Sequence, residues 1–218
     1  MKPLCCTAEM QFLCNSDKIA QVSQFNVPIH ISWILILLNK ILDAIDGRSH
    51  TWYGAQAMLN DLAQIEIRPL RAGEDTTAFR TLNEEWITRH FTLEKADRET
   101  LGDPENKILS RGGWIFMAYL GAQAVGCVAL IPVREGVYEV SKMAVSPQMR
   151  GFGIGRKLLQ HAVTQAQRMG AKSLFLASNA KLENAVHLYE SIGFRHVPPE
   201  SLPLTAYSRA NVFMEMPF

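Results

Sequence analysis

Residues 145–156 combine arginines and glycines at a spacing that suits the binding of a phosphate group. Arg150, Gly153 and Gly155 form the pattern Arg-x-x-Gly-x-Gly between an apolar stretch and an amphipathic one. Glycines let a backbone approach a ligand without a Cβ in the way, and the first amides of a helix point outward without partners. The helix dipole adds positive potential there. The segment therefore predicts a phosphate or pyrophosphate site, to which Arg150 and Arg156 can donate charged hydrogen bonds.

Two other phosphate-binding motifs do not fit this segment. A P-loop ends in a lysine followed by serine or threonine, and that pair is absent here. A dinucleotide-binding fold needs Gly-x-Gly-x-x-Gly after an early strand. A glycine-rich strand-to-helix turn that binds no ligand remains the alternative when this motif is taken alone.

The elements around the loop follow from hydrophobic patterning. Alternation and apolar runs predict strands at residues 65–70, 114–120, 124–133, 138–145, 173–177 and 212–216. Helical spacing and capping residues predict helices at residues 75–91, 103–109, 153–169 and 182–192. Asp75 is expected to cap the first of these helices, and Gly193 to end the last. The buried side of the helix at 153–169 is expected to hold Ile154, Leu158, Leu159, Ala162 and Ala166.

This order of elements predicts an α/β fold with a mixed sheet and helices on both faces. The strands near residues 140 and 175, joined by the helix after 153, would form one right-handed βαβ unit. The protein has 218 residues, and this pattern accounts for residues 65–218 as one domain.

Three further segments carry a resemblance to a known family. The strand Lys142-Met143-Ala144-Val145 precedes the loop, the sequence LYESIGF occupies 188–194, and SNAKL occupies 178–182. Together with the loop, they resemble the GNAT superfamily of acyl-CoA-dependent N-acetyltransferases, whose hallmark is Q/R-x-x-G-x-G/A. The resemblance covers about residues 65–218 and implies a mixed, mostly antiparallel central sheet flanked by helices.

The resemblance also implies a set of contacts with CoA. The backbone amides from Arg150 to Gly155 would hold the pyrophosphate, and the backbone of Met143 and Val145 would bond the pantetheine. The amide of Met143 or Ala144 would polarise the thioester carbonyl. The implied cofactor-binding residues are Met143, Ala144, Val145, Arg150, Gly151, Phe152, Gly153, Ile154, Gly155, Arg156 and Asn179.

Two residues are implied to transfer protons. Tyr189 matches the tyrosine that protonates the departing CoA thiolate in many members; a packing aromatic on an amphipathic helix is the alternative. Glu139 matches a glutamate that takes the proton from the attacking amine, usually through water. A solvated carboxylate is the alternative for Glu139, and Glu85, His90 or bulk water could be the base instead. Strict alternation would place Val140, Lys142 and Ala144 opposite Glu139, Ser141 and Met143.

The composition of the chain limits the classes of function that the sequence supports. The formal net charge of +1 argues against broad electrostatic binding to nucleic acid. The four cysteines have no partners at metal-ligand spacing, so we expect no metal site and free thiols in the cytoplasm. Cys127 lies in a core strand without a nearby base, which argues against an acyl-cysteine intermediate. His161 and His187 are expected on helix surfaces.

Residues 1–64 form an N-terminal extension that the pattern leaves unassigned. Its apolar run at 29–38 is shorter than the roughly 20 residues of a membrane span, so no integral span is expected. The run could be the core of a signal peptide, a buried helix, or a peripheral helix that contacts a membrane or a partner. The true start could also be Met58, with the upstream residues a wrongly extended reading frame.

The sequence therefore predicts transfer of an acetyl group from acetyl-CoA to an unidentified primary amine. The amine belongs to a small molecule or to a protein or peptide, and the helices near 75–110 would line its groove, with Glu85, Trp86, His90 and Phe91 as candidates. A non-catalytic sensor of acyl-CoA is the alternative function. An edge-strand homodimer would suit this architecture.

Overall fold

The computed structural model describes residues 65–201 and 207–218. Every expectation for residues 1–64 lies outside the described residues. Within the described residues, seven strands form one sheet in the order β1-β2-β3-β4-β5-β7-β6. The strands are β1 (Glu66–Pro69), β2 (Trp114–Leu120), β3 (Gln123–Arg134), β4 (Val137–Val145), β5 (Ser173–Ser178), β6 (Arg195–His196) and β7 (Val212–Pro217). Only β4 and β5 pair in parallel, which confirms the expected mixed, mostly antiparallel sheet.

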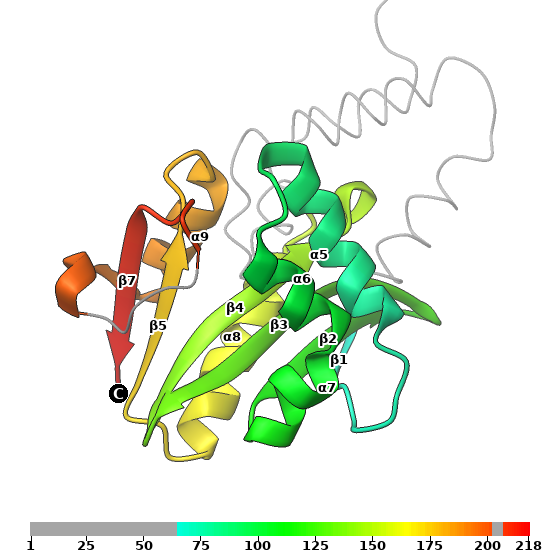
Figure 1. Cartoon of the computed structure of the whole chain (residues 1–218), viewed down its shortest axis with the longest axis horizontal. Coiled ribbons are helices and arrows are strands. Elements are labelled where there is room, and N and C mark those ends of the chain that lie inside the picture. Colours follow the sequence, from blue (N-terminus) through cyan, green and yellow to red (C-terminus); the bar gives the residue numbers. More distant parts are fainter. Residues whose placement is uncertain (1–64, 202–206) are drawn as a thin grey trace, which may run out of the picture. The chain divides into compact units, whose positions relative to one another are not determined.

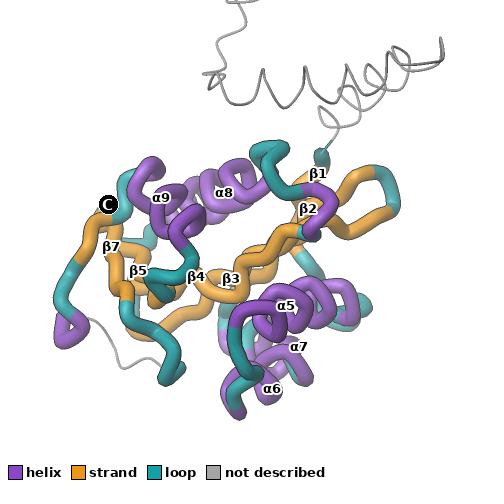
Figure 2. Tube along the Cα trace, turned by 90° about the horizontal axis from the view of Figure 1, so that it is seen from above, coloured by secondary structure: helices purple, strands orange, loops and turns teal. Residues whose placement is uncertain are grey.

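Helices cover both faces of this sheet (Figure 2). On one face lie α5 (Thr77–His90), α6 (Lys95–Gly102) and α7 (Pro104–Lys107). On the other face lie α8 (Ile154–Arg168) and α9 (Glu183–Ile192). Two hydrophobic cores result, one between the sheet and α8, the other between the sheet and α5.

The residues expected on the buried side of α8 are those that the structure buries: Ile154, Leu158, Leu159, Ala162 and Ala166. Gly193 ends α9 with a φ angle of 115°, as expected for a glycine at this position. Asp75 lies one residue before the N-cap of α5, Thr76, but its Oδ1 accepts a hydrogen bond from the Thr77 amide at 2.9 Å. Helix α6 and strand β6 were not expected from the sequence.

The pairing of β3 with β4 shifts register twice, once between Pro132 and Arg134 and once, at a β-bulge beside the separation of β4 from β5, between Cys127 and Ala129. Lys142 and Met143 of β4 lie together opposite the single residue Val128 of β3. The flanking pairs are Cys127 with Ala144 and Ala129 with Ser141. A bulge adds one residue to one strand, so it reverses the faces that later residues of that strand occupy.

The bulge makes the expected strict alternation of residues 139–144 wrong. Val140 and Met143 both pack into the core beneath α8, although they were expected on opposite faces. Ala144 belongs to the core beneath α5. The extra residue shifts the phase of the strand by one position.

β4 and β5 diverge after a short parallel pairing. Val137–Glu139 pairs with Ser173–Phe175, and the two strands separate beyond that point (Figure 1). β5 continues its pairing with β7 as far as Ser178, while residues 140–145 of β4 have no strand partner on the β5 side within the described part of the chain. Backbone N–H and C=O groups on that edge of β4 are therefore available to a ligand.

Candidate active site

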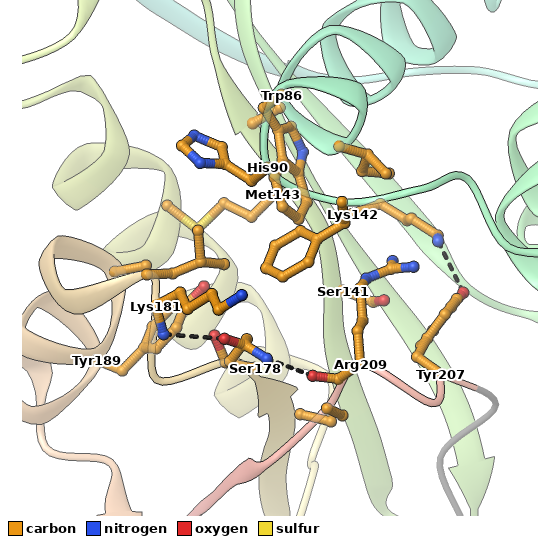
Figure 3. A pocket seen from close by; sticks show the side chains of 18 of the residues that line it. Trp86, His90, Ser141, Lys142, Met143, Ser178, Lys181, Tyr189, Tyr207 and Arg209 are labelled. Carbon is orange, nitrogen blue, oxygen red and sulfur yellow. Dashed lines mark hydrogen bonds between the residues drawn. The ribbon is translucent and has the colours of Figure 1, made fainter.

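A cavity of about 480 Å³ opens where β4 and β5 diverge (Figure 3). Its wall brings together residues from β4, β5, α5, α9 and the segment before β7. The residues expected from the sequence that line it are Glu139, Met143, Ala144, Val145, Arg150, Asn179 and Tyr189. The other loop residues, Gly151, Phe152, Gly153, Ile154, Gly155 and Arg156, lie outside its wall.

The start of α8 meets the requirements of an anion site. Its N-cap is Gly153, so no side chain caps the first amides, and no acidic residue occupies the first turn. Unsatisfied amides at the N-terminus of a helix attract anions, and the dipole of a 15-residue helix adds to that attraction. The backbone around Gly153 therefore suits a phosphate group.

The two glycines of the motif have different roles. Gly153 has a φ angle of 78°, which glycine adopts without strain, and no atom lies within 4 Å of where its Cβ would be. A Cβ on Gly155 would lie 3.4 Å from Met143 Cε and 3.5 Å from Leu188 Cδ2. Gly153 thus shapes the turn, while at Gly155 the side chains of β4 and α9 lie at ordinary contact distance from where a Cβ would be.

The two arginines of the motif point to different places. Arg150 lines the cavity, and its Nε donates to the backbone oxygen of Val145 at 3.2 Å. Arg156 lies on the outer side of α8, where its Nη2 donates to Ser191 Oγ at 2.8 Å. Arg150 is therefore the arginine that is placed beside the cavity.

The bulge gives the amides of Met143 and Ala144 different surroundings. The sulfur of Cys127 donates to the backbone oxygen of Lys142 at 3.5 Å, so this oxygen points toward that sulfur. In a planar trans peptide the following N–H points the opposite way, which directs the Met143 amide away from Cys127. The Ala144 amide instead faces the sulfur of Cys127. Of the two amides expected to polarise a carbonyl, the geometry favours that of Met143.

Tyr189 and Glu139 both have raised pKa values in this cavity. Burial raises the pKa of Tyr189 to about 12. Burial also raises the pKa of Glu139 above its usual range, although a hydrogen bond with Ser141 and the charge of Lys142 act in the opposite direction. A phenol that stays protonated can donate a proton, and a carboxylate with a raised pKa is a stronger base than one in water.

Asn179 connects two segments beside the cavity. Its Nδ2 donates to the backbone oxygen of Arg209 at 2.5 Å, and its Oδ1 accepts from the Lys181 amide at 2.9 Å. The residue is 8% exposed. Asn179 therefore holds the segment before β7 against the end of β5, and its bond with the Lys181 amide also forms a local turn.

One end of the cavity is lined by residues at the end of α5. Trp86, His90 and Phe91 line it, while Glu85 is exposed and does not. The Trp86 indole donates to Asn83 Oδ1 at 3.3 Å and meets the Phe91 ring edge-on at 6.4 Å. Three of the four residues expected at an acceptor groove thus line this cavity.

A buried charge cluster beside this end was not expected from the sequence. Lys142 Nζ lies 2.7 Å from Asp97 Oδ1 and 2.7 Å from the Tyr207 hydroxyl. Arg209 donates to the same carboxylate and to Glu94. We name Glu94, Asp97, Lys142, Tyr207 and Arg209 the ion-pair cluster. Its members are far apart in the sequence, and no local pattern links them.

Other titratable side chains have structural environments. Cys127 is fully buried, and burial raises the pKa of its thiol to about 12, so it is not a thiolate nucleophile near neutral pH. His161 was expected on a helix surface, but its ring packs edge-on against Phe116 at 4.8 Å and burial lowers its pKa. His187 is exposed, as expected.

Two features are absent from the part of the chain that the structure describes. No group of three or more His, Cys, Asp or Glu side chains in residues 65–201 and 207–218 is placed to hold a metal ion. No helix in this part of the chain is both long and apolar enough to cross a membrane.

The sequence of this chain is similar to those of known N-acetyltransferases. The model of the acetyltransferase (GNAT) family matches residues 67–194. An uncharacterized N-acetyltransferase of Schizosaccharomyces pombe is 28% identical over 155 residues, which cover 67% of this chain and 94% of that protein. The uncharacterized N-acetyltransferase YjgM of Escherichia coli is 38% identical over 72 residues, which cover 33% of this chain and 43% of that protein.

Solved structures share the fold. An acetyltransferase of the GNAT family from Staphylococcus aureus Mu50 superposes with a TM-score of 0.64 at 21% identity, covering 70% of this chain and 98% of that one. The PaiA N-acetyltransferase of Thermoplasma acidophilum, solved in complex with coenzyme A, gives a TM-score of 0.56 at 18% identity, covering 71% and 99%. The fold is that of the GNAT acyltransferases. The chain belongs to the acetyltransferase (GNAT) family, and it is an acyltransferase enzyme.

Proposed function

We propose that this domain transfers an acetyl group from acetyl-CoA to a primary amine, by direct attack of the amine in a ternary complex. One observation carries the proposal: the open edge of β4 and the phenol of Tyr189 line the same cavity, and the uncapped start of α8 packs against that strand. Acyl transfer from CoA needs an anion site, a donor for the carbonyl oxygen and an acid for the thiolate. The start of α8, the edge of β4 and Tyr189 provide these three groups in that order.

The binding of CoA uses mainly backbone groups. The amides after Arg150, as far as Gly155, take the pyrophosphate, because the Arg150 amide already donates to the Pro147 oxygen, and the guanidinium of Arg150 beside the cavity adds charge. Backbone groups of Met143 and Val145 bond the pantetheine as an added strand would. The side-chain amide of Asn179 donates one hydrogen to the Arg209 backbone oxygen, and it donates the other to CoA.

The Met143 amide receives the carbonyl oxygen of the thioester. As the amine adds to the carbonyl carbon, negative charge develops on this oxygen, and a donor that is already aimed at it stabilises that charge. Because the bulge fixes the direction of this amide, little reorganisation is needed during the reaction.

Three proton transfers complete the reaction. Glu139, through a water molecule, takes a proton from the acceptor ammonium, so that the neutral amine can form the C–N bond. The C–S bond then breaks as Tyr189 donates its proton to the CoA thiolate, and the second proton that the acceptor nitrogen loses returns through water to the Tyr189 phenolate. The raised pKa of Tyr189, about 12, keeps the phenol protonated but makes it a weaker acid than in water, so its position beside the departing sulfur has to favour the transfer.

The acceptor is an amine of a small molecule or of a protein or peptide. Trp86, His90 and Phe91 form the part of the cavity that it enters. The free thiol of Cys127 suits a reducing compartment, so we place the reaction in the cytoplasm. An edge-strand homodimer is the assembly that this sheet would accommodate.

The test measures binding and turnover on the full-length protein. Calorimetry with CoA establishes binding, and thiol release from acetyl-CoA is followed with a panel of amines and peptides. Release that depends on an amine supports the transferase. CoA binding with no release by any acceptor supports a sensor of acyl-CoA instead, and no binding of CoA contradicts the proposal.

A further inference from the structure

Lys142 has a strained backbone within the bulge of β4. Among the residues that the structure describes, it is the only one other than glycine with a positive φ angle, which is 51°. A residue with a Cβ rarely adopts such a φ, and it persists only when its surroundings hold it. The neighbours of the Lys142 side chain are therefore the place to look for what holds it.

The Lys142 side chain is anchored at its far end. It is 3% exposed, and its ammonium lies 2.7 Å from both Asp97 Oδ1 and the Tyr207 hydroxyl (Figure 3 draws the second bond). Asp97 is fixed in turn, because its side chain is fully buried, caps the Glu94 amide and accepts two bonds from Arg209. Separating a buried ammonium from its counter-charge has a large cost in free energy. The ion pair therefore restrains the backbone of Lys142.

The restrained backbone is the one that orients the Met143 amide. The backbone oxygen of Lys142 accepts from the Cys127 sulfur, and the Met143 N–H across the same peptide plane points the opposite way. A rotation of the Lys142 backbone toward ordinary φ values would turn this peptide plane. The direction of the amide thus depends on the conformation of one strained residue.

We propose that Lys142 is a positioning residue, whose buried ion pair with Asp97 holds the β4 bulge so that the Met143 amide points into the cavity. The inference rests on the proposed function, because it concerns the amide that receives the thioester carbonyl. It assigns a role to the ion-pair cluster, whose residues take no part in the proposed proton transfers. It also explains why the strand places a lysine where its backbone favours glycine.

The test follows the Met143 amide by NMR in full-length protein labelled with 15N-methionine. The chain has nine methionines, so the spectrum is sparse, and Met143→Leu assigns the signal. The protein is titrated with CoA and then with acetyl-CoA. Only acetyl-CoA carries the carbonyl, so in the wild type it should shift the Met143 amide proton beyond the shift that CoA produces.

Lys142→Met removes the ammonium and keeps the length of the side chain. We expect it to abolish the additional shift with acetyl-CoA, while CoA binds with wild-type affinity. For an amine found by thiol release, kcat should fall about tenfold or more with KM for acetyl-CoA unchanged. Lys142→Arg, which can still pair with Asp97, should restore most of both signals.

Two control variants separate positioning from stability. Lys172→Met makes the same chemical change at an exposed lysine and should leave the shift and kcat unchanged. Leu101→Ala weakens the packing of α6 without removing the ion pair, so it lowers stability while the additional shift remains. A loss of the shift in Leu101→Ala equal to that in Lys142→Met would overturn the inference.

The outcomes distinguish this inference from the proposed function. If the additional shift persists in Lys142→Met, the ion pair does not position the amide, although the transferase stands. If both ligands bind the wild type and shift Met143 equally, the Met143 amide does not receive the carbonyl, and the inference fails with it. If neither ligand binds, the proposed function itself is wrong.

Discussion

The guanidinium of Arg209 donates hydrogen bonds to both oxygens of the Asp97 carboxylate, at 2.6 and 2.9 Å. These residues are 112 positions apart, and their contact joins α6 to the segment before β7. Lys142 of β4 shares the same carboxylate. One fully buried acidic side chain thus holds three segments around the end of the cavity that would receive the acceptor.

Asp97→Asn should lower the free energy of unfolding by about 3–5 kcal/mol, because it leaves the Lys142 ammonium buried without a counter-charge. Urea unfolding at neutral pH measures the change. Glu84→Gln is the matched control, since Glu84 pairs with Arg80 at the surface and should contribute less than about 1 kcal/mol. A change for Asp97→Asn as small as that of the control would show that the cluster contributes little to stability.

The contribution of Asp97 should depend on pH. Burial alone would raise the pKa of Asp97, but the hydrogen bonds from Arg209 and Lys142 outweigh it and lower the pKa below the ordinary 3.8. A carboxyl with a lowered pKa stabilises the fold above its unfolded pKa, and this stabilisation is lost as pH falls through the folded pKa. The difference in unfolding free energy between wild type and Asp97→Asn should be constant above about pH 5 and shrink below pH 3.8. A difference that stays constant into strong acid would contradict this reasoning.

Tyr189→Phe should reduce kcat about tenfold or more, while the affinity for CoA is unchanged. The reason is that the phenol acts only when the thiolate departs. Because burial raises its pKa to about 12, the rate should show no decline from ionisation of Tyr189 up to about pH 10. Steady-state kinetics across this range test both points. Tyr119→Phe, at a tyrosine bonded to Arg68 away from the cavity, is the control and should retain full activity.

Glu139→Gln should change the pH dependence of kcat/KM. A base acts in its deprotonated form, so activity should rise with pH through the pKa of Glu139, which burial moves above the ordinary 4.5. In Glu139→Gln this rise should disappear and the rate should be low throughout. Glu135→Gln changes an exposed glutamate in the turn before β4 and should keep the wild-type profile. An unchanged rise in Glu139→Gln would assign the proton transfer to another group.

Much of this site follows from local sequence patterns. The buried face of α8, the βαβ unit and the glycine-rich loop depend on residues close together in the chain, and all were predictable. Helix α6 was not, because Lys95–Gly102 buries only Asp97 and Leu101 and so lacks an apolar stripe. Its capping box uses Glu94 and Asp97 rather than the serine or threonine that usually signals one.

The bulge and the ion-pair cluster could not be predicted for a different reason. Alternation in residues 139–144 indicates a regular strand, and only the register with β3 reveals the extra residue. Lys142 meets Asp97, 45 positions earlier, and Tyr207, 65 positions later. Such pairings are set by the packing of the whole sheet, which no local pattern encodes.

Gly153→Ala should weaken the binding of CoA. Its φ angle of 78° would force a Cβ into a conformation that costs about 1–2 kcal/mol, and relief of that strain would displace the amides that bind the pyrophosphate. Gly121→Ala is a matched control, because Gly121 has a φ of 57° in the β2–β3 turn and equally open surroundings. Both variants should lose similar stability, and calorimetry should find weaker CoA binding only in Gly153→Ala. Equal affinities would place the pyrophosphate elsewhere.

Acetyl transfer itself is tested most directly by the mass of the acceptor. Full-length wild type and Tyr189→Phe are each incubated with acetyl-CoA and a panel of amines and peptides. Mass spectrometry identifies the products, and a thiol assay quantifies the CoA that is released. We predict that at least one amine gains a single acetyl group, that CoA thiol appears in equal amount, and that the variant is about tenfold slower or more. A wild-type protein that binds acetyl-CoA yet acetylates no amine, or one whose transfer is unaffected by Tyr189→Phe, would contradict the account.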